Sequence, residues 1–339
     1  MARPGLLSGR CSEQGGERVG LVKQGISPEG SIGACRMNGW TPRCVSACEF
    51  PSNVIRRTMR SSTTKFSRFM RGFHSTLSYL KAPFGEKLLR PLESDTAERR
   101  ERGLVIVLPG IEGVSSLNHS LVQGLLDARI PYAVKLHDWT LKRNPAFINL
   151  WLTGRCRRAA AHVAELIVDY QSRHPLRPVN LIGHSGGGAL IPYILEELPR
   201  KTCVQNAVLI APAISPHFDL SHALERVSGR LVNFHSQLDW YFLGVGTTLV
   251  GTMDRRFGRS AGNCGFRIMQ STETHRQLIE QRFSEVRYHW SMLRSWHYGG
   301  HFSCMNRVFV ERYIAPLLQE QPASHEVLPS RDLSIRDVA

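Results

Sequence analysis

Short runs of apolar residues, each about as long as a buried strand, recur over the middle of the chain. Between these runs lie helix-like stretches, in which apolar residues recur every three or four positions. Short strands that alternate with helices predict a parallel sheet covered by helices on both faces. We therefore expect one α/β domain over residues 104–318. Apolar runs suited to buried strands occupy residues 104–108, 132–136, 179–182, 207–210 and 231–234, and the helix-like stretches are 115–129, 156–170, 186–198 and one that follows residue 305.

The regions on either side of this domain lack such periodicity. Residues 1–75 are rich in Gly, Ser, Arg and Pro and poor in large apolar side chains, which predicts disorder. We expect residues 76–103 to form a linker and residues 319–339 to form a polar tail. Translation that starts at Met59 or Met70 is an alternative explanation for the region without periodicity.

Long apolar segments are missing from the sequence. No run approaches the roughly 18 apolar residues that span a bilayer. No continuous apolar segment follows the basic residues near the N-terminus, as it would in a signal peptide. We expect no transmembrane segment and a cytoplasmic protein.

Positive charge is concentrated before the predicted domain. The formal net charge of the 339 residues is +15. Residues 51–90 contain nine Lys or Arg and one acidic residue, Glu86, whereas the chain from residue 104 onward has 25 basic and 19 acidic residues, a balance of +6. The domain therefore needs no nucleic acid as a partner. A charge run is typical of a solvated tail, and contact of the basic N-terminal region with an anionic surface is the alternative.

Cysteine spacing gives no sign of a metal centre. The eight cysteines form no C-x-x-C pair, and none has zinc-finger spacing to histidines. We expect the four in the predicted domain to be small buried thiols. The sequence predicts no metal site and no cofactor.

One stretch, residues 178–198, carries the clearest chemical pattern. It reads PVNLIGHSGGGALIPYILEEL: an apolar strand, the pentapeptide GHSGG and an amphipathic run that suits a helix. Gly-x-Ser-x-Gly between a strand and a helix is typical of a nucleophile elbow, where glycines avoid clashes around a strained serine. The helix N-terminus also directs free N–H groups toward the serine. We predict that Ser185 is a nucleophile.

A serine hydroxyl needs a base, and the base needs an acid that orients it. In an elbow of this type the chain order is serine, acid, histidine. Asp239 comes shortly after the strand at 231–234 and is favoured as the acid. Asp219 lies one strand earlier and suits a cap for a helix that starts near Ser221.

Two histidines near the C-terminus compete for the role of the base. His301 follows two glycines, whose loop can approach the serine closely, and is favoured. His297 lies between Trp296 and Tyr298 and is expected to be a packed or substrate-facing side chain. His184, inside the pentapeptide, is expected to point away from the site and to pack.

Two backbone N–H groups are expected to meet the oxyanion of a tetrahedral intermediate. One belongs to Gly186, the residue after the nucleophile. The other belongs to Ile111, in the loop LPGIEG after the first strand. Gly110 and Gly113 let this backbone fold over the pocket.

The strand that ends in LPGIEG, the GHSGGG turn, the acid in HSQLDW and the terminal GGHFSC together resemble the α/β-hydrolase superfamily. They are most similar to a small branch of uncharacterised bacterial hydrolases of planctomycetes. The resemblance covers residues 104–318 and implies the α/β-hydrolase fold, with a mostly parallel sheet of about six strands that starts at the strand usually counted third. It also implies Ser185 as nucleophile, Asp239 as acid and His301 as base. Many relatives have His-Gly in the oxyanion loop where this chain has Pro109-Gly110, so a side-chain contact is expected to be missing.

These residues predict a serine hydrolase that cleaves a carboxylic ester through an acyl-enzyme on Ser185, as an esterase, lipase or thioesterase does. Apolar residues at 147–152 and 240–250 favour a small-molecule ester with an apolar acyl or aromatic group. Residues 240–266 hold six glycines without a clear period and form either a mobile flap or a connecting loop. The alternatives are an acyltransferase that uses the same three residues and a non-catalytic binding protein of this fold.

Overall fold

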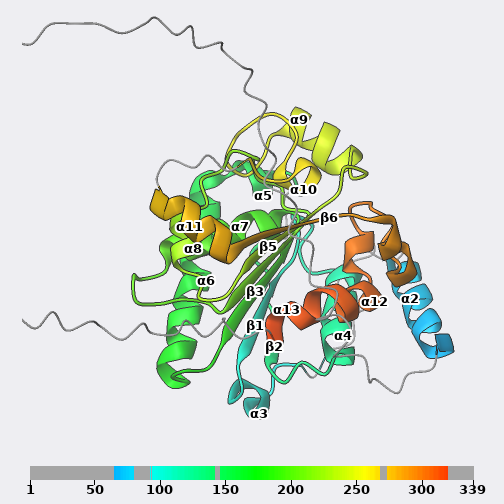
Figure 1. Cartoon of the computed structure of the whole chain (residues 1–339), viewed down its shortest axis with the longest axis horizontal. Coiled ribbons are helices and arrows are strands. Elements are labelled where there is room, and N and C mark those ends of the chain that lie inside the picture. The colour runs from blue at the N-terminus through cyan, green and yellow to red at the C-terminus, as the bar shows by residue number, and fades with distance from the viewer. Residues whose placement is uncertain (1–64, 80–91, 93, 142–145, 268–272, 320–339) are drawn as a thin grey trace, which may run out of the picture. The chain divides into compact units, whose positions relative to one another are not determined.

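The computed structural model of the protein describes residues 65–79, 92, 94–141, 146–267 and 273–319. The predictions for residues 1–64 and for the tail from residue 320 lie outside the described residues. Within the described part, one sheet separates two layers of helices (Figure 1). This arrangement confirms the predicted parallel sheet with helices on both faces.

Six parallel strands form the sheet, in the order β2-β1-β3-β4-β5-β6. Their bounds are Leu104–Leu108 (β1), Ala133–Leu136 (β2), Val179–His184 (β3), Asn206–Ile210 (β4), Leu231–His235 (β5) and Phe283–Arg287 (β6). The first five strands correspond to the predicted apolar runs. β6 has no counterpart among them, because this edge strand reads FSEVR and is only partly buried. In contrast, every residue of β1, β3 and β4 is buried, as is typical of the interior of a parallel sheet.

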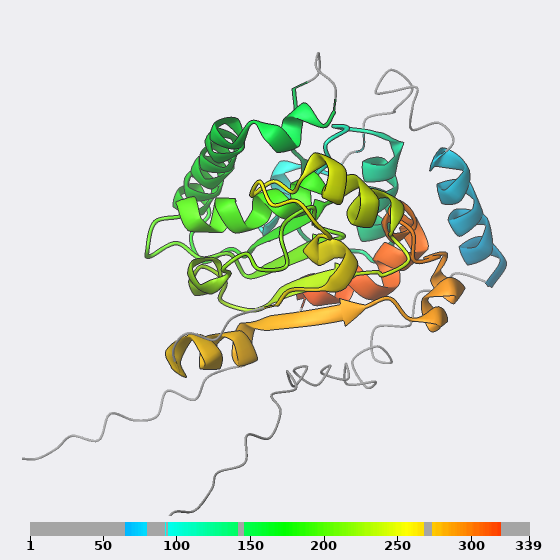
Figure 2. The ribbon, with the colours of Figure 1, turned by 90° about the horizontal axis from the view of Figure 1, so that it is seen from above.

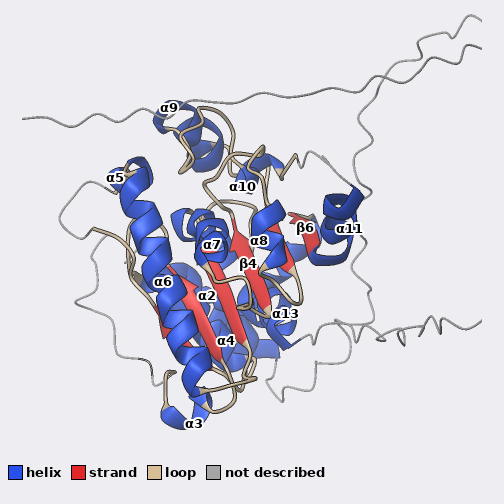
Figure 3. Ribbon diagram, turned by 90° about the vertical axis from the view of Figure 1, so that its left-hand side faces the viewer, coloured by secondary structure: helices blue, strands red, loops and turns tan. Residues whose placement is uncertain are grey.

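Two groups of helices cover the faces of the sheet. One face carries α6 (Thr153–Arg173), α7 (Gly186–Glu197), α8 (Ser221–Glu225) and α11 (Glu273–Arg282). Figure 3 looks onto this face and shows α6, α7 and α8 in front of the strands. The other face carries α4 (Ser116–Asp127), α12 (Arg307–Phe309), the π-helix η6 (Val310–Ile314) and α13 (Ala315–Gln319). No helix in these described stretches has the length and apolar character needed to cross a bilayer.

Short elements connect the strands and helices. They are α3 (Ala97–Arg100), α5 (Ile148–Trp151), the π-helix η3 (Tyr241–Gly246), α9 (Thr247–Val250), α10 (Ala261–Cys264) and the 3-10 helices η4 (Trp290–Ser295) and η5 (Ser303–Met305). Residues 240–266, whose glycines left two interpretations open, thus contain η3, which continues directly into α9, and α10, which follows after ten residues of turns and loop. Whether this stretch moves as a flap stays a prediction.

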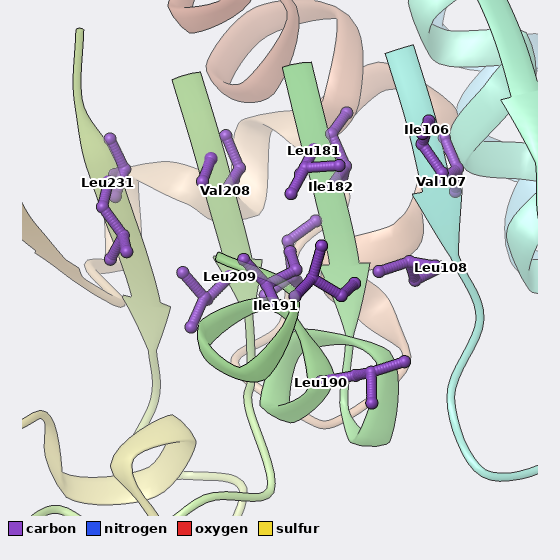
Figure 4. Packing of buried hydrophobic residues seen from close by; sticks show 14 of the residues in the cluster. Ile106, Val107, Leu108, Leu181, Ile182, Leu190, Ile191, Val208, Leu209 and Leu231 are labelled. Carbon is purple, nitrogen blue, oxygen red and sulfur yellow. The ribbon is translucent and has the colours of Figure 1, made fainter. Parts of the chain in front are cut away.

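Helix α7 is anchored in the apolar core beside β3. Side chains from β1, β3, β4 and β5 meet those of α7 on one face of the sheet (Figure 4). Leu190 and Ile191 of α7 are fully buried there. Burying a side chain of this size contributes about 1.5–3 kcal/mol. The turn between β3 and α7 is therefore held at both ends by well-packed elements.

The chain begins its described part with a helix that the sequence pattern does not predict. Helix α2 (Lys65–Tyr79) packs against α4 and α12, so the prediction of disorder is wrong for residues 65–75. Its contacts are polar and aromatic: Asn306 donates to the Gly72 carbonyl at 3.1 Å, Arg71 pairs with Asp127 at 2.5 Å, and the Phe69 ring lies 5.2 Å from that of Trp296. The large apolar residues of α2 do recur at helical spacing, but residues 1–75 as a whole are poor in such residues, and those on α2 stay exposed. These exposed residues are Phe66, Phe69, Phe73 and Leu77.

Candidate active site

Ser185 lies in a strained turn at the carboxyl end of the central strand β3. Its backbone has φ 53° and ψ −115°, and α7 begins at the next residue. A non-glycine residue in this region costs on the order of 1–3 kcal/mol and persists only where the surroundings enforce it. Here they do, because the Ser185 N–H donates to the Ile210 carbonyl at 2.9 Å and the Ala189 N–H donates to the Ser185 carbonyl at 3.0 Å.

Two glycines make this turn sterically possible. A Cβ on Gly183 would lie 2.3 Å from the Gly187 carbonyl oxygen. A Cβ on Gly187 would lie 2.4 Å from the carbonyl oxygens of both Leu108 and Pro109, at the end of β1. Backbone atoms cannot give way as a flexible side chain does. The turn therefore requires glycine at both positions, which explains the GHSGG pattern in physical terms.

Three of the predicted site residues lie in one line of hydrogen bonds. His301 Nδ1 lies 2.5 Å from Asp239 Oδ2, and His301 Nε2 lies 3.1 Å from Ser185 Oγ. All three side chains are buried. A carboxylate accepts from the Nδ1–H tautomer of a neutral histidine, which leaves Nε2 free to accept the serine hydroxyl proton. The structure thus brings together the nucleophile, base and acid candidates favoured by the sequence.

Asp239 is positioned by a residue that the sequence reasoning missed. Asn263, in α10, donates its side-chain N–H groups to the carbonyl of Ser236 at 3.1 Å and to that of Asp239 at 3.0 Å. The loop after β5 is thereby pinned at both ends. Among the described residues, Asp239 Oδ1 has no hydrogen-bond partner, so the carboxylate directs its strongest interaction at His301.

The loop that carries His301 is held from behind by His184. His184 Nε2 lies 2.9 Å from the His301 carbonyl oxygen, and the two ring centroids are 4.8 Å apart. His184 is a packed side chain, as expected. It does not point away from the site, however, because it contacts the loop of His301. Burial lowers the pKa of His184 to about 3, so its ring is neutral and donates from Nε2 to the carbonyl. His184 thus supports the histidine loop across the elbow.

The competing acid and base candidates make other contacts. Asp219 accepts from the Ser221 N–H at 2.9 Å at the start of α8, and hydrogen bonds with Ser221 lower the pKa of the Asp219 carboxyl. His297 Nδ1 lies 2.9 Å from Ser303 Oγ, and its ring packs 4.6 Å from that of Phe309. Burial lowers the pKa of His297 to about 3. Asp219 thus accepts a hydrogen bond at the start of α8, one residue before the N-cap Leu220, and His297 is a packed side chain.

The two predicted oxyanion donors approach each other across the site. A Cβ on Gly186 would lie 2.6 Å from Ile111 Cγ2 and 3.4 Å from Ile111 N. Two side chains fix the loop that carries Ile111: Trp139 Nε1 donates to the Pro109 carbonyl at 2.8 Å, and Asn149 Nδ2 donates to the Ile111 carbonyl at 3.0 Å. The sequence reasoning missed both anchors. They hold the peptide units on either side of the predicted donor in fixed orientations.

A carboxyl group stands beside these donors. Glu112 follows Ile111 and turns its side chain back toward Gly110. The side chain keeps contact with solvent, yet the protein atoms crowded around its carboxyl raise its pKa, while the nearby His301 opposes this rise. A negative charge on the Glu112 carboxyl would repel an oxyanion bound by these donors.

Apolar side chains surround the reactive groups. The ring of Phe242, in η3, stacks on His301 with centroids 4.9 Å apart. A Cβ on Gly186 would touch Trp139 at 3.1 Å as well as Ile111, so both side chains lie against the start of α7. Such walls exclude water and strengthen hydrogen bonds to developing charge. Among the described residues, no group of His, Cys, Asp and Glu side chains is arranged to hold a metal ion.

Comparisons with known proteins give partial matches. The model of a family described as a protein of unknown function, DUF726, matches residues 140–247, a stretch that includes Ser185 and Asp239. The chain has no match among curated proteins.

Several solved structures of low sequence identity are similar to the chain. One is a candidate dienelactone hydrolase from Klebsiella pneumoniae subsp. pneumoniae MGH 78578, at 11% identity, with 68% of this chain and 90% of that chain covered and a TM-score of 0.40. Another is LpqC, a poly(3-hydroxybutyrate) depolymerase from Bordetella parapertussis, at 14% identity, 78% and 97% coverage and a TM-score of 0.39. Lipase B of Aspergillus fumigatus has 13% identity, 63% and 51% coverage and a TM-score of 0.38.

The geometry of the molecule itself identifies its fold. The sheet is parallel, with β3 at its centre, and helices cover both faces. A glycine-lined turn carries a serine with positive φ from that strand into a helix. An acid after β5 and a histidine before the last helices follow it in chain order and meet it in space. A central strand, a nucleophile turn and this order are the features of the α/β-hydrolase fold, and the chain has this fold.

Proposed function

We propose that the protein is a serine hydrolase that cleaves a carboxylic ester through an acyl-enzyme on Ser185. One observation carries the proposal: the line of hydrogen bonds from Asp239 through His301 to Ser185, at 2.5 and 3.1 Å. A serine hydroxyl is a weak nucleophile unless a base accepts its proton. His301 is the base in this proposal, and Asp239 keeps its ring in the required tautomer and stabilises the imidazolium that forms.

The reaction proceeds in two halves. Ser185 Oγ attacks the ester carbonyl carbon while its proton passes to His301 Nε2, and the carbonyl oxygen becomes an oxyanion. The N–H groups of Gly186 and Ile111 donate to that oxyanion. The intermediate then collapses, His301 gives its proton to the departing alcohol, and the acyl group stays on Ser185. Water, deprotonated by His301, attacks the acyl-enzyme and releases the carboxylic acid by the same sequence of steps.

The surroundings of the serine support an apolar acyl or aromatic group in the substrate. Phe242 stacks on His301, and Ile111 and Trp139 lie against Gly186. A sugar or peptide would leave polar groups without partners between such walls, at a cost of about 1–3 kcal/mol for each buried group. An acyl chain would instead gain free energy from the same contacts.

A fluorophosphonate probe and a series of p-nitrophenyl esters of increasing acyl length test this proposal. The probe should label the wild-type protein and fail to label Ser185→Ala, and turnover should show an optimum in acyl length. His301→Ala should slow both reactions by several orders of magnitude. The matched control is His297→Ala, in the same loop, which should keep most of the labelling. Labelling and turnover that persist in Ser185→Ala would overturn the proposal.

A further inference from the structure

Large apolar side chains are exposed together at one end of the molecule. They belong to two stretches that are distant in the chain, α5 with its flanks and the segment from η3 to the turn after α9. Leu249 and Phe257 are the most exposed of them, at 73% and 67%. We call this set the apolar rim; its members are Phe147, Trp151, Leu152, Trp240, Tyr241, Val245, Leu249 and Phe257.

Direct contacts join the two stretches of the apolar rim. Trp151 Nε1 donates to the Val250 carbonyl at 2.6 Å. Arg255 donates to the Trp151 carbonyl at 3.1 Å, and its guanidinium lies 5.4 Å from the centre of the Trp151 ring. Phe257 lies close to Gly251, since a Cβ there would be 3.5 Å from its ring. The exposed side chains therefore form one surface instead of scattered single residues.

This surface borders the candidate active site. Trp240 directly follows Asp239 in the chain, and Phe242, two residues further, stacks on His301. Figures 1 and 2 show η3 and α9 at the end of the molecule toward which the strands point. A contiguous exposed apolar patch of this kind marks an interaction site, because monomeric proteins otherwise keep such patches small.

The charges on the same surface have one sign. Arg255, Arg256 and Arg259 are exposed in the turn RRFGR, on either side of Phe257. The two stretches that form the rim, residues 146–160 and 238–259, contain two acidic residues. Asp239 is buried beside His301, and Asp254 accepts from the Ser215 N–H and the Thr252 hydroxyl. The exposed charge of the rim is therefore positive.

We propose that the apolar rim binds the surface of an anionic lipid bilayer. Tryptophan and tyrosine favour the boundary between headgroups and acyl chains, aliphatic side chains enter the hydrocarbon, and arginines attract anionic headgroups. The occupant is lipid and not nucleic acid, because Leu249, Val245 and Leu152 cannot stack on bases and gain free energy only by leaving water. This orientation places the candidate active site against the membrane, where apolar esters accumulate.

Sedimentation of the full chain with vesicles tests the proposal without any measurement of catalysis. Wild-type protein should bind vesicles of phosphatidylcholine with phosphatidylglycerol, and it should bind vesicles of phosphatidylcholine alone much more weakly. The double variant Leu249→Ser/Phe257→Ser should lose about tenfold or more in binding to the anionic vesicles. The matched control is Leu176→Ser, which changes a 103% exposed leucine just before β3, at the opposite end of the strands. The control should bind like the wild type.

A second pair of variants tests the charge. Arg255→Gln/Arg256→Gln should lower the affinity for anionic vesicles by about fivefold per charge at low salt, whereas Arg200→Gln, exposed at the far end of α7, should not. Ser185→Ala should bind vesicles like the wild type, so failure of the proposed hydrolase chemistry is distinguishable from failure of this proposal. Circular dichroism of each variant checks that it is folded. Unchanged binding of the folded Leu249→Ser/Phe257→Ser variant, or equal binding to neutral and anionic vesicles, would overturn the proposal.

Discussion

The two regions that meet at His301 are built in opposite ways. The elbow, from β3 through Ser185 into α7, is buried at every position from residue 179 to residue 195. The cap segment, residues 240–259, lies on the other side of His301 and exposes most of its large apolar side chains. The elbow consists of one strand and one long helix, whereas the cap segment consists of short helical pieces and turns.

This difference separates two tasks. Proton transfer and oxyanion binding need atoms that are fixed to within a fraction of an ångström, and close packing on all sides provides this. Recognition of apolar molecules of varying shape needs exposed side chains and backbone that can adjust. We therefore expect a change in side-chain volume to cost more stability in the elbow than in the cap segment.

The largest effect is expected at Asp239. This residue directly precedes the cap segment in the chain but is buried like the residues of the elbow. Asp239→Asn should lower ester turnover by about 10⁴-fold, because an amide stabilises the wrong tautomer of His301. Asp219→Asn is the control; asparagine caps a helix as well as aspartate does, so turnover and stability should stay close to wild type. Steady-state kinetics on a short p-nitrophenyl ester measure both variants. Equal losses in the two would remove Asp239 from the proposed mechanism.

Replacement of a glycine by alanine should change the free energy of unfolding in opposite directions in the two regions. Gly187→Ala forces a Cβ within 2.4 Å of two backbone carbonyl oxygens and should lower the free energy of unfolding by about 1–3 kcal/mol or more. Gly244→Ala, in η3, places a Cβ at an ordinary 3.6 Å from Trp240 Cβ and should raise it by up to about 1 kcal/mol, since alanine loses less entropy in a helix. Urea denaturation followed by circular dichroism measures the two changes. A stable Gly187→Ala protein would show that the elbow can relax.

A further prediction concerns pH. Burial lowers the pKa of His184 and His297 to about 3, from an ordinary value of 6.5. At these two sites the unfolded chain therefore binds more protons than the folded one between pH 3 and pH 6.5. Their contribution to stability should be complete above pH 6.5 and be lost as the pH is lowered toward 3. His297→Gln should reduce the loss of Tm between pH 7 and pH 5. The control His217→Gln, at an exposed histidine, should leave the loss of Tm unchanged. An identical pH dependence of Tm in the two variants would contradict the lowered pKa of His297.

Sequence reasoning succeeded where local pattern and chemistry coincide. The elbow was predictable because backbone atoms leave no room for a Cβ at positions 183 and 187. Both positions must therefore be glycine, which produces the Gly-x-Ser-x-Gly pattern. Asp239 and His301 were favoured from strand order and loop composition, and they lie together with Ser185 in the structure. Their roles as acid and base remain predictions.

The elements that were missed depend on contacts between distant segments. Asn263, Asn149 and Trp139 orient the site loops through bonds to backbone carbonyls, and nothing in their neighbouring residues reveals those partners. Strand β6 lies at the edge of the sheet and is only partly buried, so its sequence mixes apolar and polar residues instead of forming an apolar run. Helix α2 lies in a stretch that is poor in large apolar residues, and the hydrogen-bond partners that hold it, Ser120 and Asn306, stand far from it in the chain.

The way α2 is attached has a consequence for synthesis of the chain. The Gly72 carbonyl and the Thr76 hydroxyl both accept from Asn306, 234 and 230 positions later, while Ser75 Oγ meets Ser120 and also accepts from the Arg307 N–H. Since a polypeptide leaves the ribosome from its N-terminus at about 5–20 residues per second, α2 emerges well before residues 306 and 307 exist. We expect α2 to wait at least several seconds for these partners and to dock last, as the step that completes folding of the newly made chain.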